Sequence, residues 1–252
     1  MKIAFAGFDL MYPALEALSR DNEIVRLFTC RVDGKYETNN RVRELAASLG
    51  VPYTYEPITR ADIDELFETG CGLLVSAGYY YLIPVDSRLP MVNIHPSLLP
   101  YGRGAWPMPL AILDKLPESG VTVHKLAESF DTGDILMQRR FALTPDEDLE
   151  SFMDKVNSLL PDMMSELTAD FPRLYAGAQP QGEGEYQAQP DPADYVLSAE
   201  YTVEFADRVL RAFRGFPCYY DDGEREHNIY RKNAYYGENT GEPYPLKDGY
   251  IR

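Results

Sequence analysis

Cysteine is scarce in this sequence. Its three cysteines, Cys30, Cys71 and Cys218, are an odd number scattered along 252 residues. Such a distribution supplies neither a disulfide framework nor the closely spaced Cys and His residues of a structural metal site. We therefore expect buried thiols in a reducing compartment and no metal ion.

Long apolar runs are missing as well. No stretch approaches the roughly 18 apolar residues that a membrane span requires. The N-terminal segment has a short apolar run without a basic region or a small-residue cleavage site. These absences predict a soluble, cytoplasmic protein with no membrane partner.

Positive charge is also in short supply. The sequence has 24 Lys and Arg residues against 40 Asp and Glu residues, which gives a net charge of −16. A chain of this charge repels a polyanion unless its few cations gather in one patch. Nucleic acid is therefore a poor first candidate for a partner.

A dinucleotide-binding fingerprint is absent from the first glycine turn. Gly7 is followed by Phe8, Asp9, Leu10 and Met11 instead of the two further glycines of G-x-G-x-x-G. The first turn therefore gives no support to an NAD site.

What the sequence does contain is an alternation of strand-like and helix-like segments. This alternation predicts a parallel sheet with right-handed crossovers. The expected fold class is α/β: a Rossmann-like, mostly parallel sheet flanked by helices, followed by a small C-terminal helix-plus-β appendage. The expected strands are 2–6, 23–29, 72–77, 91–95, 120–126 and 135–142, and the expected helices are 11–18, 41–49, 61–68, 109–115 and 148–175.

The composition changes after residue 175. Residues 176–194 are rich in Gly, Pro, Gln and acids, which is typical of a linker or an open crossover. A helix is expected over 202–213, and the rest of the chain is rich in Tyr and Gly. We predict an N-terminal α/β domain over residues 1–185 and a C-terminal α+β subdomain over 186–252, which is short for an independent domain.

Two polar side chains, Asn93 and His95, open the stretch NIHPSLLPYGRGAWP. Residues two apart in an extended segment share a face, and Pro96 favours a strand that ends at His95. The carboxyl ends of strands in a parallel sheet are where ligands and catalytic groups gather. The pair therefore suits a catalytic edge, although a kinked loop with a buried histidine fits the same residues.

A second polar cluster, Glu128 to Asp134, lies between two predicted strands. Gly133 permits a tight turn there, and the acids reach the Asn93 and His95 edge if the strands are neighbours. A carboxylate beside an imidazole favours the protonated ring, and an adjacent amide can donate to an oxyanion without titrating. Such a trio suits acyl transfer to an amine through one tetrahedral intermediate, although an aspartate in a turn often has only a capping role.

The two stretches together resemble the formyltransferases that use N10-formyltetrahydrofolate, the superfamily of glycinamide ribonucleotide and methionyl-tRNA formyltransferases. The resemblance rests on Asn-x-His, the following Ser-Leu-Leu-Pro, Arg103-Gly104 and Asp-Thr-Gly-Asp, in family order and at about family spacing. It covers most of residues 1–185. It implies a formyltransferase catalytic domain there, with N10-formyltetrahydrofolate as cosubstrate and no metal.

The resemblance also implies roles for individual residues. Asn93 would hold the formyl oxygen, His95 would stabilise the oxyanion or relay the proton of the amine, and Asp131 would orient His95. Folate would sit against the loop after Ala77, whose aromatic run is bulkier than usual in the family, and against the segment that ends at the aspartate. The expected folate contacts are Gly78, Tyr79, Tyr81, Leu82, Ile83, Glu128, Phe130 and Asp131.

Four residues are expected to contact the amine substrate: Phe8, Asp9, Arg103 and His124. Phe8 and Asp9 follow the first strand, where this family receives its acceptor, although a plain turn role fits them equally. Arg103 suits a substrate phosphate or nearby carbonyl groups. His124 alternates with apolar neighbours and faces either the core or the substrate.

Length and charge narrow the acceptor. About 60 residues follow the Gly- and Pro-rich segment, fewer than the barrel of roughly a hundred residues that the methionyl-tRNA enzymes carry on family analogy. The net charge also disfavours tRNA. The chain is more similar to the shorter enzymes that formylate nucleotide-linked amino sugars, whose C-terminal parts often help them dimerise, so a homodimer stays open. Other amines (a hydroxyornithine type or methionyl-tRNA) and a non-catalytic folate-binding relative are the alternatives.

Overall fold

The fold is described from a computed structural model that covers residues 1–252. The chain forms two compact units, each assembled from several segments. The first unit comprises Met1–Gly104, Ser119–Phe141 and Asp154–Tyr186, and the second comprises Ala105–Glu118, Ala142–Met153 and Gln187–Arg252. The division into domains at residues 1–185 and 186–252 stays a prediction.

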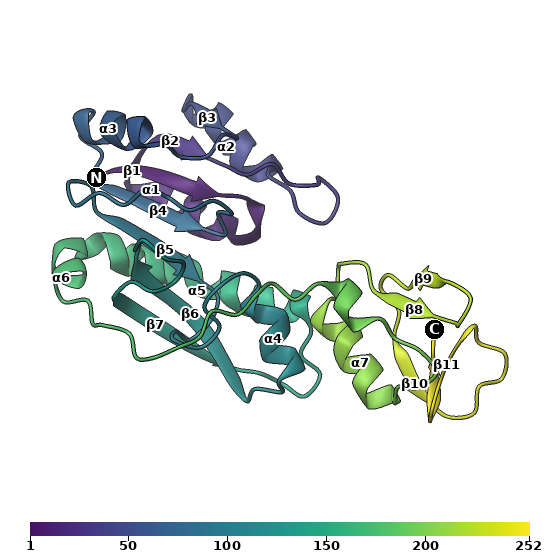
Figure 1. Ribbon diagram of the computed structural model, residues 1–252. Helices are drawn as coiled ribbons and strands as arrows, with labels where there is room; N and C mark the ends of the chain where they lie inside the picture. Colours follow the sequence, from purple (N-terminus) through teal and green to yellow (C-terminus); the bar gives the residue numbers. More distant parts are fainter. The chain divides into compact units, whose positions relative to one another are not determined.

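The first unit is built on a seven-stranded sheet in the order β3-β2-β1-β4-β5-β6-β7 (Figure 1). Strands β1 to β5 pair in parallel, whereas β5 and β6 are antiparallel. The mostly parallel sheet predicted from the sequence is therefore confirmed. The strands are β1 (Lys2–Gly7), β2 (Glu23–Phe28), β3 (Tyr53–Thr54), β4 (Leu73–Ala77), β5 (Met91–His95), β6 (Glu118–Lys125) and β7 (Ile135–Ala142).

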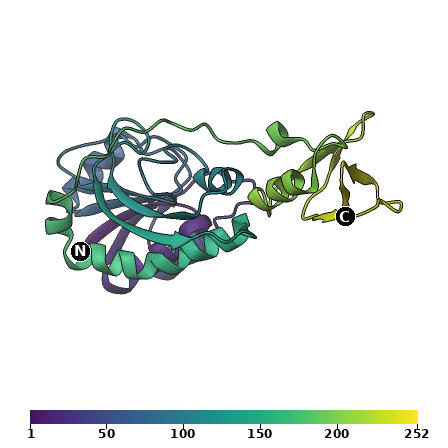
Figure 2. The same ribbon diagram turned by 90° about the horizontal axis from the view of Figure 1, so that it is seen from below.

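Helices connect and flank these strands, as the alternation predicted. They are α1 (Tyr12–Asp21), α2 (Asn40–Leu49), α3 (Arg60–Glu68), α5 (Leu149–Ala169) and α6 (Phe171–Ala176), with a short 3-10 helix η1 (Asp9–Met11). The helix expected over 148–175 is divided in two: α5 continues through Pro161 and ends at Ala169, and α6 begins at Phe171, just before Pro172. Figure 2 shows α5 running along one face of the sheet.

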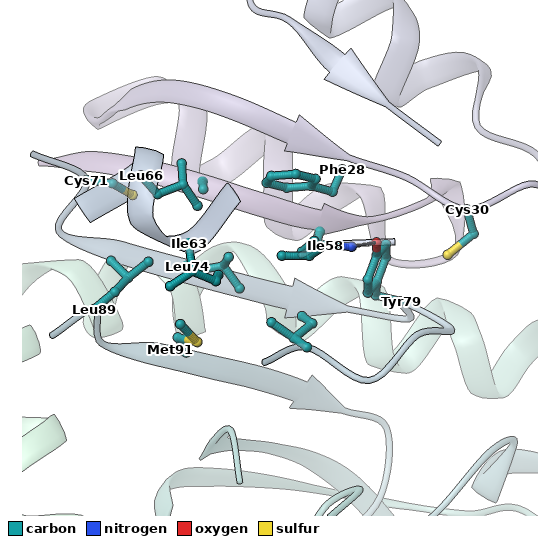
Figure 3. Close-up of a cluster of buried hydrophobic side chains, with 13 residues drawn as sticks. Phe28, Cys30, Ile58, Ile63, Leu66, Cys71, Leu74, Tyr79, Leu89 and Met91 are labelled. Atoms are coloured by element: carbon teal, nitrogen blue, oxygen red, sulfur yellow. Dashed lines mark hydrogen bonds between the residues drawn. The ribbon is translucent and has the colours of Figure 1, made fainter. Parts of the chain in front are cut away.

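One hydrophobic cluster of the first unit supports the loop that follows β4 (Figure 3). Ile63 and Leu66 of α3 pack there with Leu74 of β4, and the cluster continues into Tyr79 and Ile83 beyond the strand end. Burying such aliphatic side chains stabilises the fold by about 1.5–3 kcal/mol each. The partly buried side chains that pack against the cluster include Tyr81, Val85 and Leu126.

The second unit has its own core. Ile112 of α4 (Pro107–Leu113) packs in one cluster with Val209 and Leu210 of α7 (Val203–Ala212). The predicted helix over 202–213 is thus found as α7. The other elements are η2 (Pro192–Tyr195), a two-stranded sheet of β8 (Tyr219–Asp221) and β9 (Glu226–Asn228), and a three-stranded sheet of β10 (Ala234–Tyr236), β12 (Gly249–Ile251) and β11 (Tyr244–Leu246). No helix in either unit is both long enough and apolar enough to cross a membrane.

Candidate active site

Strand β5 ends at His95, as the proline after it predicted. The loop that follows is fixed to the neighbouring strands, because the Thr122 hydroxyl donates to the Ser97 carbonyl (2.7 Å) and accepts from the Leu99 N–H (3.2 Å). Gln138 of β7 donates to the Leu99 carbonyl at 2.9 Å. These bonds hold the loop in place immediately after the two polar residues of β5.

The loop after β6 brings Asp131 to the same place. Asn93 and His124 are register partners in the antiparallel pair of β5 and β6, so the loop leaves the sheet beside β5. Gly133 allows a close return, because a Cβ atom there would lie 1.9 Å from the Lys125 carbonyl oxygen. Asp131 has a φ of 56°, a left-handed conformation that aspartate tolerates better than most residues.

Three polar side chains and one backbone N–H meet around the Asp131 carboxylate. Its Oδ1 atom accepts a hydrogen bond from Asn93 Nδ2 (3.1 Å) and lies 3.5 Å from His95 Nδ1 and 3.3 Å from His124 Nε2. Its Oδ2 atom accepts from the Gly104 N–H at 2.9 Å. The fold therefore brings Asn93 and His95 of β5 together with Asp131, which is distant in the sequence, and His124 joins them.

Hydrogen-bond partners define the protons on both imidazoles. His95 Nε2 lies 2.6 Å from the Gly102 carbonyl and His124 Nδ1 lies 2.8 Å from the Lys125 carbonyl. A carbonyl only accepts, so each of these nitrogens carries the hydrogen. His124 Nε2 lies 3.2 Å from Asn93 Nδ2 and 3.3 Å from Asp131 Oδ1. In the neutral His95 ring, Nδ1 is the nitrogen that can take up a proton.

Burial and pairing set the charges of the site. Burial lowers the pKa of His95 below its ordinary value of 6.5, and the Asp131 charge only partly opposes this effect. Burial alone would raise the pKa of Asp131, but the nearby His95 and His124 rings and the Gly104 N–H outweigh it and lower that pKa to about 2. At neutral pH the site therefore holds a neutral imidazole beside an ionised carboxylate.

The residues expected to contact folate fall into two groups. Tyr79 and Ile83 are buried in the cluster of Figure 3, where the Tyr79 hydroxyl accepts from the Ile58 N–H at 3.2 Å. Leu82 and Phe130 are exposed apolar side chains, at 51% and 43% of their surface.

Glu128 is exposed, Tyr81 is partly exposed and Gly78 adopts a φ of 72°. The loop after β4 and the segment approaching Asp131 share an anchor, since Tyr81 and Leu126 pack against the same cluster. The folate contacts themselves stay a prediction.

Phe8 and Asp9 have structural surroundings. Phe8 is 1% exposed. The Asp9 carboxylate accepts from the backbone N–H groups of Arg41 (3.2 Å) and Val42 (3.1 Å) and from the Thr38 hydroxyl (2.7 Å). Asp9 thereby caps the N-terminus of α2, because the side chain of Asn39, the N-cap residue, makes no capping bond. These contacts give Asp9 the structural role that the sequence analysis left open as an alternative. A contact between Asp9 and the substrate stays a prediction.

Arg103 is engaged with the segment that follows α6. Its guanidinium donates to Gln181 Oε1 (3.1 and 2.8 Å), to the Gly182 carbonyl (2.9 Å) and to the Gly184 carbonyl (2.9 Å). These carbonyl contacts correspond to the structural alternative weighed for this residue. A contact with a substrate phosphate stays a prediction.

Three groups of the site had no signal in the sequence. Two are backbone atoms, the Gly102 carbonyl and the Gly104 N–H, which no side-chain motif reports. The third is Gln181, whose Nε2 donates to the carbonyls of Asp131 (2.9 Å) and Gly133 (2.6 Å). The polar, Gly-rich sequence around Gln181 predicted a linker. The one sequence signal for its contact with Arg103 is the Arg103-Gly104 motif together with an amide side chain far along the chain.

The chain is similar to known proteins in sequence and in fold. A family model described as "Formyl transferase" matches residues 29–168, more than half of the chain. A methionyl-tRNA formyltransferase from Ehrlichia ruminantium is 29% identical, with 95% of this chain and 82% of that protein covered.

Two solved structures have a similar fold. A sugar N-formyltransferase from a Shewanella species has a TM-score of 0.71 at 21% identity, with 91% of this chain and 96% of that chain covered. An N-formyltransferase from Helicobacter canadensis, in complex with folinic acid and dTDP-3-aminofucose, has a TM-score of 0.72 at 16% identity and covers 100% and 98% of the two chains.

Proposed function

The chain belongs to the formyl transferase family and is an N-formyltransferase, and on that premise we propose that it formylates the primary amine of a small molecule, a nucleotide-linked amino sugar, with N10-formyltetrahydrofolate as the donor. The observation that carries the proposal is the convergence of the Asn93, His95 and Asp131 side chains. No covalent enzyme intermediate is required, because direct attack of the amine suffices.

The residues present fit the donor. When bound, N10-formyltetrahydrofolate supplies a formyl carbon whose bond to N10 breaks as tetrahydrofolate leaves. The exposed Leu82 and Phe130 side chains offer apolar contacts for a flat heterocycle next to backbone polar groups. Asn93 is the partly exposed member of the trio, whereas His95 and Asp131 are buried. Its amide is therefore the group that can reach a carbonyl oxygen.

Asn93 would stabilise negative charge that develops on that oxygen. Both of its N–H groups bond within the site, to Asp131 and to His124. Turning one of them toward the oxygen leaves the other bond in place to orient the amide. An amide donor of this kind typically contributes about 2.7–4 kcal/mol to the transition state.

His95 would take the proton that the attacking amine loses and pass it on to N10 of tetrahydrofolate as the bond from the formyl carbon to N10 breaks. Its Nε2 is committed to the Gly102 carbonyl, so Nδ1 receives the proton. The resulting imidazolium then faces the ionised Asp131 carboxylate, 3.5 Å away. The buried neutral ring is thus a base at neutral pH, and the carboxylate stabilises its protonated form.

Length and charge support a nucleotide-linked amino sugar as the acceptor. The Shewanella and Helicobacter proteins are covered over 96% and 98% of their chains, so this chain has nearly their extent. A net charge of −16 disfavours a polyanionic acceptor. The second candidate is methionyl-tRNA, which is favoured by the 29% identity to the Ehrlichia enzyme.

One assay separates these functions. The protein is incubated with N10-formyltetrahydrofolate and, in turn, with dTDP- and UDP-linked amino sugars, N-hydroxyornithine and charged methionyl-tRNA, and release of tetrahydrofolate is followed. We expect turnover with a nucleotide-linked amino sugar and none with the tRNA. Turnover with methionyl-tRNA alone would support the second candidate, and donor binding without turnover on any amine would support a non-catalytic relative.

A further inference from the structure

A segment with the composition of a linker is fixed to the candidate active site. Residues 179–186 run beside the loop after β5, with isolated β-bridges from Gln179 to Ile135 and from Tyr186 to Arg103. Gly184 lies so close to this loop that a Cβ atom would be 2.5 Å from the Pro100 carbonyl oxygen. A flexible linker would not make such close and specific contacts.

The contacts of this segment link Gln181, Arg103 and Asp131 to one another. Gln181 Nε2 donates to the Asp131 carbonyl at 2.9 Å, and Gln181 Oε1 accepts from Arg103. Arg103 is followed directly by Gly104, whose N–H donates to Asp131 Oδ2 at 2.9 Å. One aspartate is therefore held at its main chain by Gln181 and at its side chain by the residue next to Arg103.

We propose that Gln181 and Arg103 are positioning residues for Asp131, which they hold in the left-handed conformation that directs its carboxylate toward Asn93 and His95. Gln181 bonds the carbonyls of both Asp131 and Gly133, and so spans the turn that contains the left-handed residue. Without this amide, two carbonyl groups lose a donor and the turn loses its only side-chain restraint from the crossover segment.

The chemical consequence follows from the separation of His95 and Asp131. Their contact is 3.5 Å, at the outer limit of direct interaction, so a small displacement of the turn weakens it. The titratable groups that face His95 are Asp131, which favours its protonation, and His124, which opposes it. A displaced Asp131 therefore leaves His95 a weaker proton acceptor while the donor-binding loop after β4 is unaffected.

The chain offers a matched control for the test. Gln179 lies in the same segment, but its side-chain amide is exposed and donates to the Gly177 carbonyl, two residues away. We compare Gln181→Met with Gln179→Met, since methionine preserves the side-chain length and introduces no charge. This inference depends on the proposed function only for its kinetic part.

Two measurements are made on each full-length variant. Steady-state kinetics give kcat and the KM values for donor and amine, and NMR titration follows the imidazole signals. The chain has only three histidines, so their signals can be assigned. A His227→Gln variant removes the signal of the histidine outside the site. For Gln181→Met we expect kcat to fall about tenfold or more with both KM values within about twofold, and the pKa of His95 to fall further. Gln179→Met should match the wild type in all of these.

The outcomes decide the matter separately from the proposed function. An unchanged His95 titration in folded Gln181→Met overturns the inference, even if kcat falls, because the role is then only structural. If Gln181→Met does not fold, Arg103→Lys is measured in the same way, and it should show the same changes to a smaller extent because lysine keeps the charge but not the planar fork. The titration needs no substrate, so it tests the positioning even if no amine is turned over.

Discussion

His95 Nδ1 and Asp131 Oδ1 are 3.5 Å apart, and both side chains are more than nine-tenths buried. A buried carboxylate is stable only when it is paired and hydrogen-bonded. Asp131 meets this requirement through its hydrogen bonds from Asn93 and Gly104. His95 is buried without a charge in the resting state, because burial lowers its pKa. The pair is therefore ready to receive one proton, which is the demand that formylation of an amine places on the protein.

Removing either member of this pair should abolish most of the turnover. We expect His95→Ala and Asp131→Ala each to lower kcat by about 10²–10⁴, because a positioned acid–base group contributes that much. Donor binding, measured by fluorescence titration, should stay within about threefold of the wild type. The control is His227→Ala, at a histidine that pairs with Asp222 in the second unit. Wild-type rates in either site variant would remove that residue from the mechanism.

The stability of the protein should depend on pH through His95. Its pKa in the folded protein is below 6.5, so the unfolded chain binds this proton more readily. Its contribution is fully present above about pH 6.5 and is lost as the pH falls. The Tm should therefore drop less between pH 7 and pH 5 in His95→Gln than in the wild type, by circular dichroism. His227→Gln serves as the comparison, and equal drops in all three proteins would contradict the expectation.

Exposed apolar side chains should determine donor affinity. We expect Leu82→Ser and Phe130→Ser each to raise the KM for the folate donor about 5–30-fold, the loss expected when about 1–2 kcal/mol of apolar contact is removed. The kcat at saturating donor should stay near that of the wild type. Leu49→Ser, at an α2 residue with similar exposure (45%), should leave the KM unchanged. A donor KM that neither site variant alters would place folate elsewhere.

Gly133 should tolerate no side chain. A Cβ atom at this position would lie 1.9 Å from the Lys125 backbone oxygen, so Gly133→Ala must displace the turn that carries Asp131. Overpacking of this kind costs about 1–3 kcal/mol, visible as a lower Tm together with reduced turnover. In Gly182→Ala the added Cβ atom would lie 3.8 Å from Pro100 Cγ, an ordinary contact, and stability should hardly change. Similar melting curves for the two variants would show that the turn is not tightly packed.

Asp9 should behave as a helix cap. Loss of its bonds to the first turn of α2 in Asp9→Ala should cost about 0.5–2 kcal/mol of unfolding free energy. The KM for the amine should not change in assays well below the melting temperature. Glu16→Ala, which removes an exposed ion pair with Arg20, should cost less than about 0.5 kcal/mol. A large rise in the amine KM for Asp9→Ala would instead return this residue to the acceptor site.

Regular elements were the most predictable part of the molecule. The strands expected at 91–95 and 135–142 have these bounds in the structure, because apolar patterning and Pro96 are local signals. Strand β3 was not predicted, since two residues, Tyr53 and Thr54, are too short for any period to appear. Helix α5 passes Pro161 because packing along its apolar side outweighs the loss of one backbone hydrogen bond.

The site was predictable only as far as side chains with recognisable chemistry allowed. The positions of Asn93, His95 and Asp131 follow from motifs on neighbouring strands. The backbone groups of Gly102 and Gly104 depend on the path of the loop, which tertiary hydrogen bonds determine. Gln181 was missed for a further reason: Gly, Pro and Gln residues suit a flexible linker and a tightly packed crossover equally well, and only contacts distinguish the two.

The contacts that residues 179–186 make with the candidate active site limit where the polypeptide can be divided. A cut made at the change of composition, after Tyr175, would retain every motif of the family and the whole central sheet. The truncated product would nevertheless lack the amide that bonds Asp131, and Arg103 would lose all three acceptors of its four side-chain hydrogen bonds. Such a fragment would contain the motifs of the family but would lack the contacts that hold Asp131 in position.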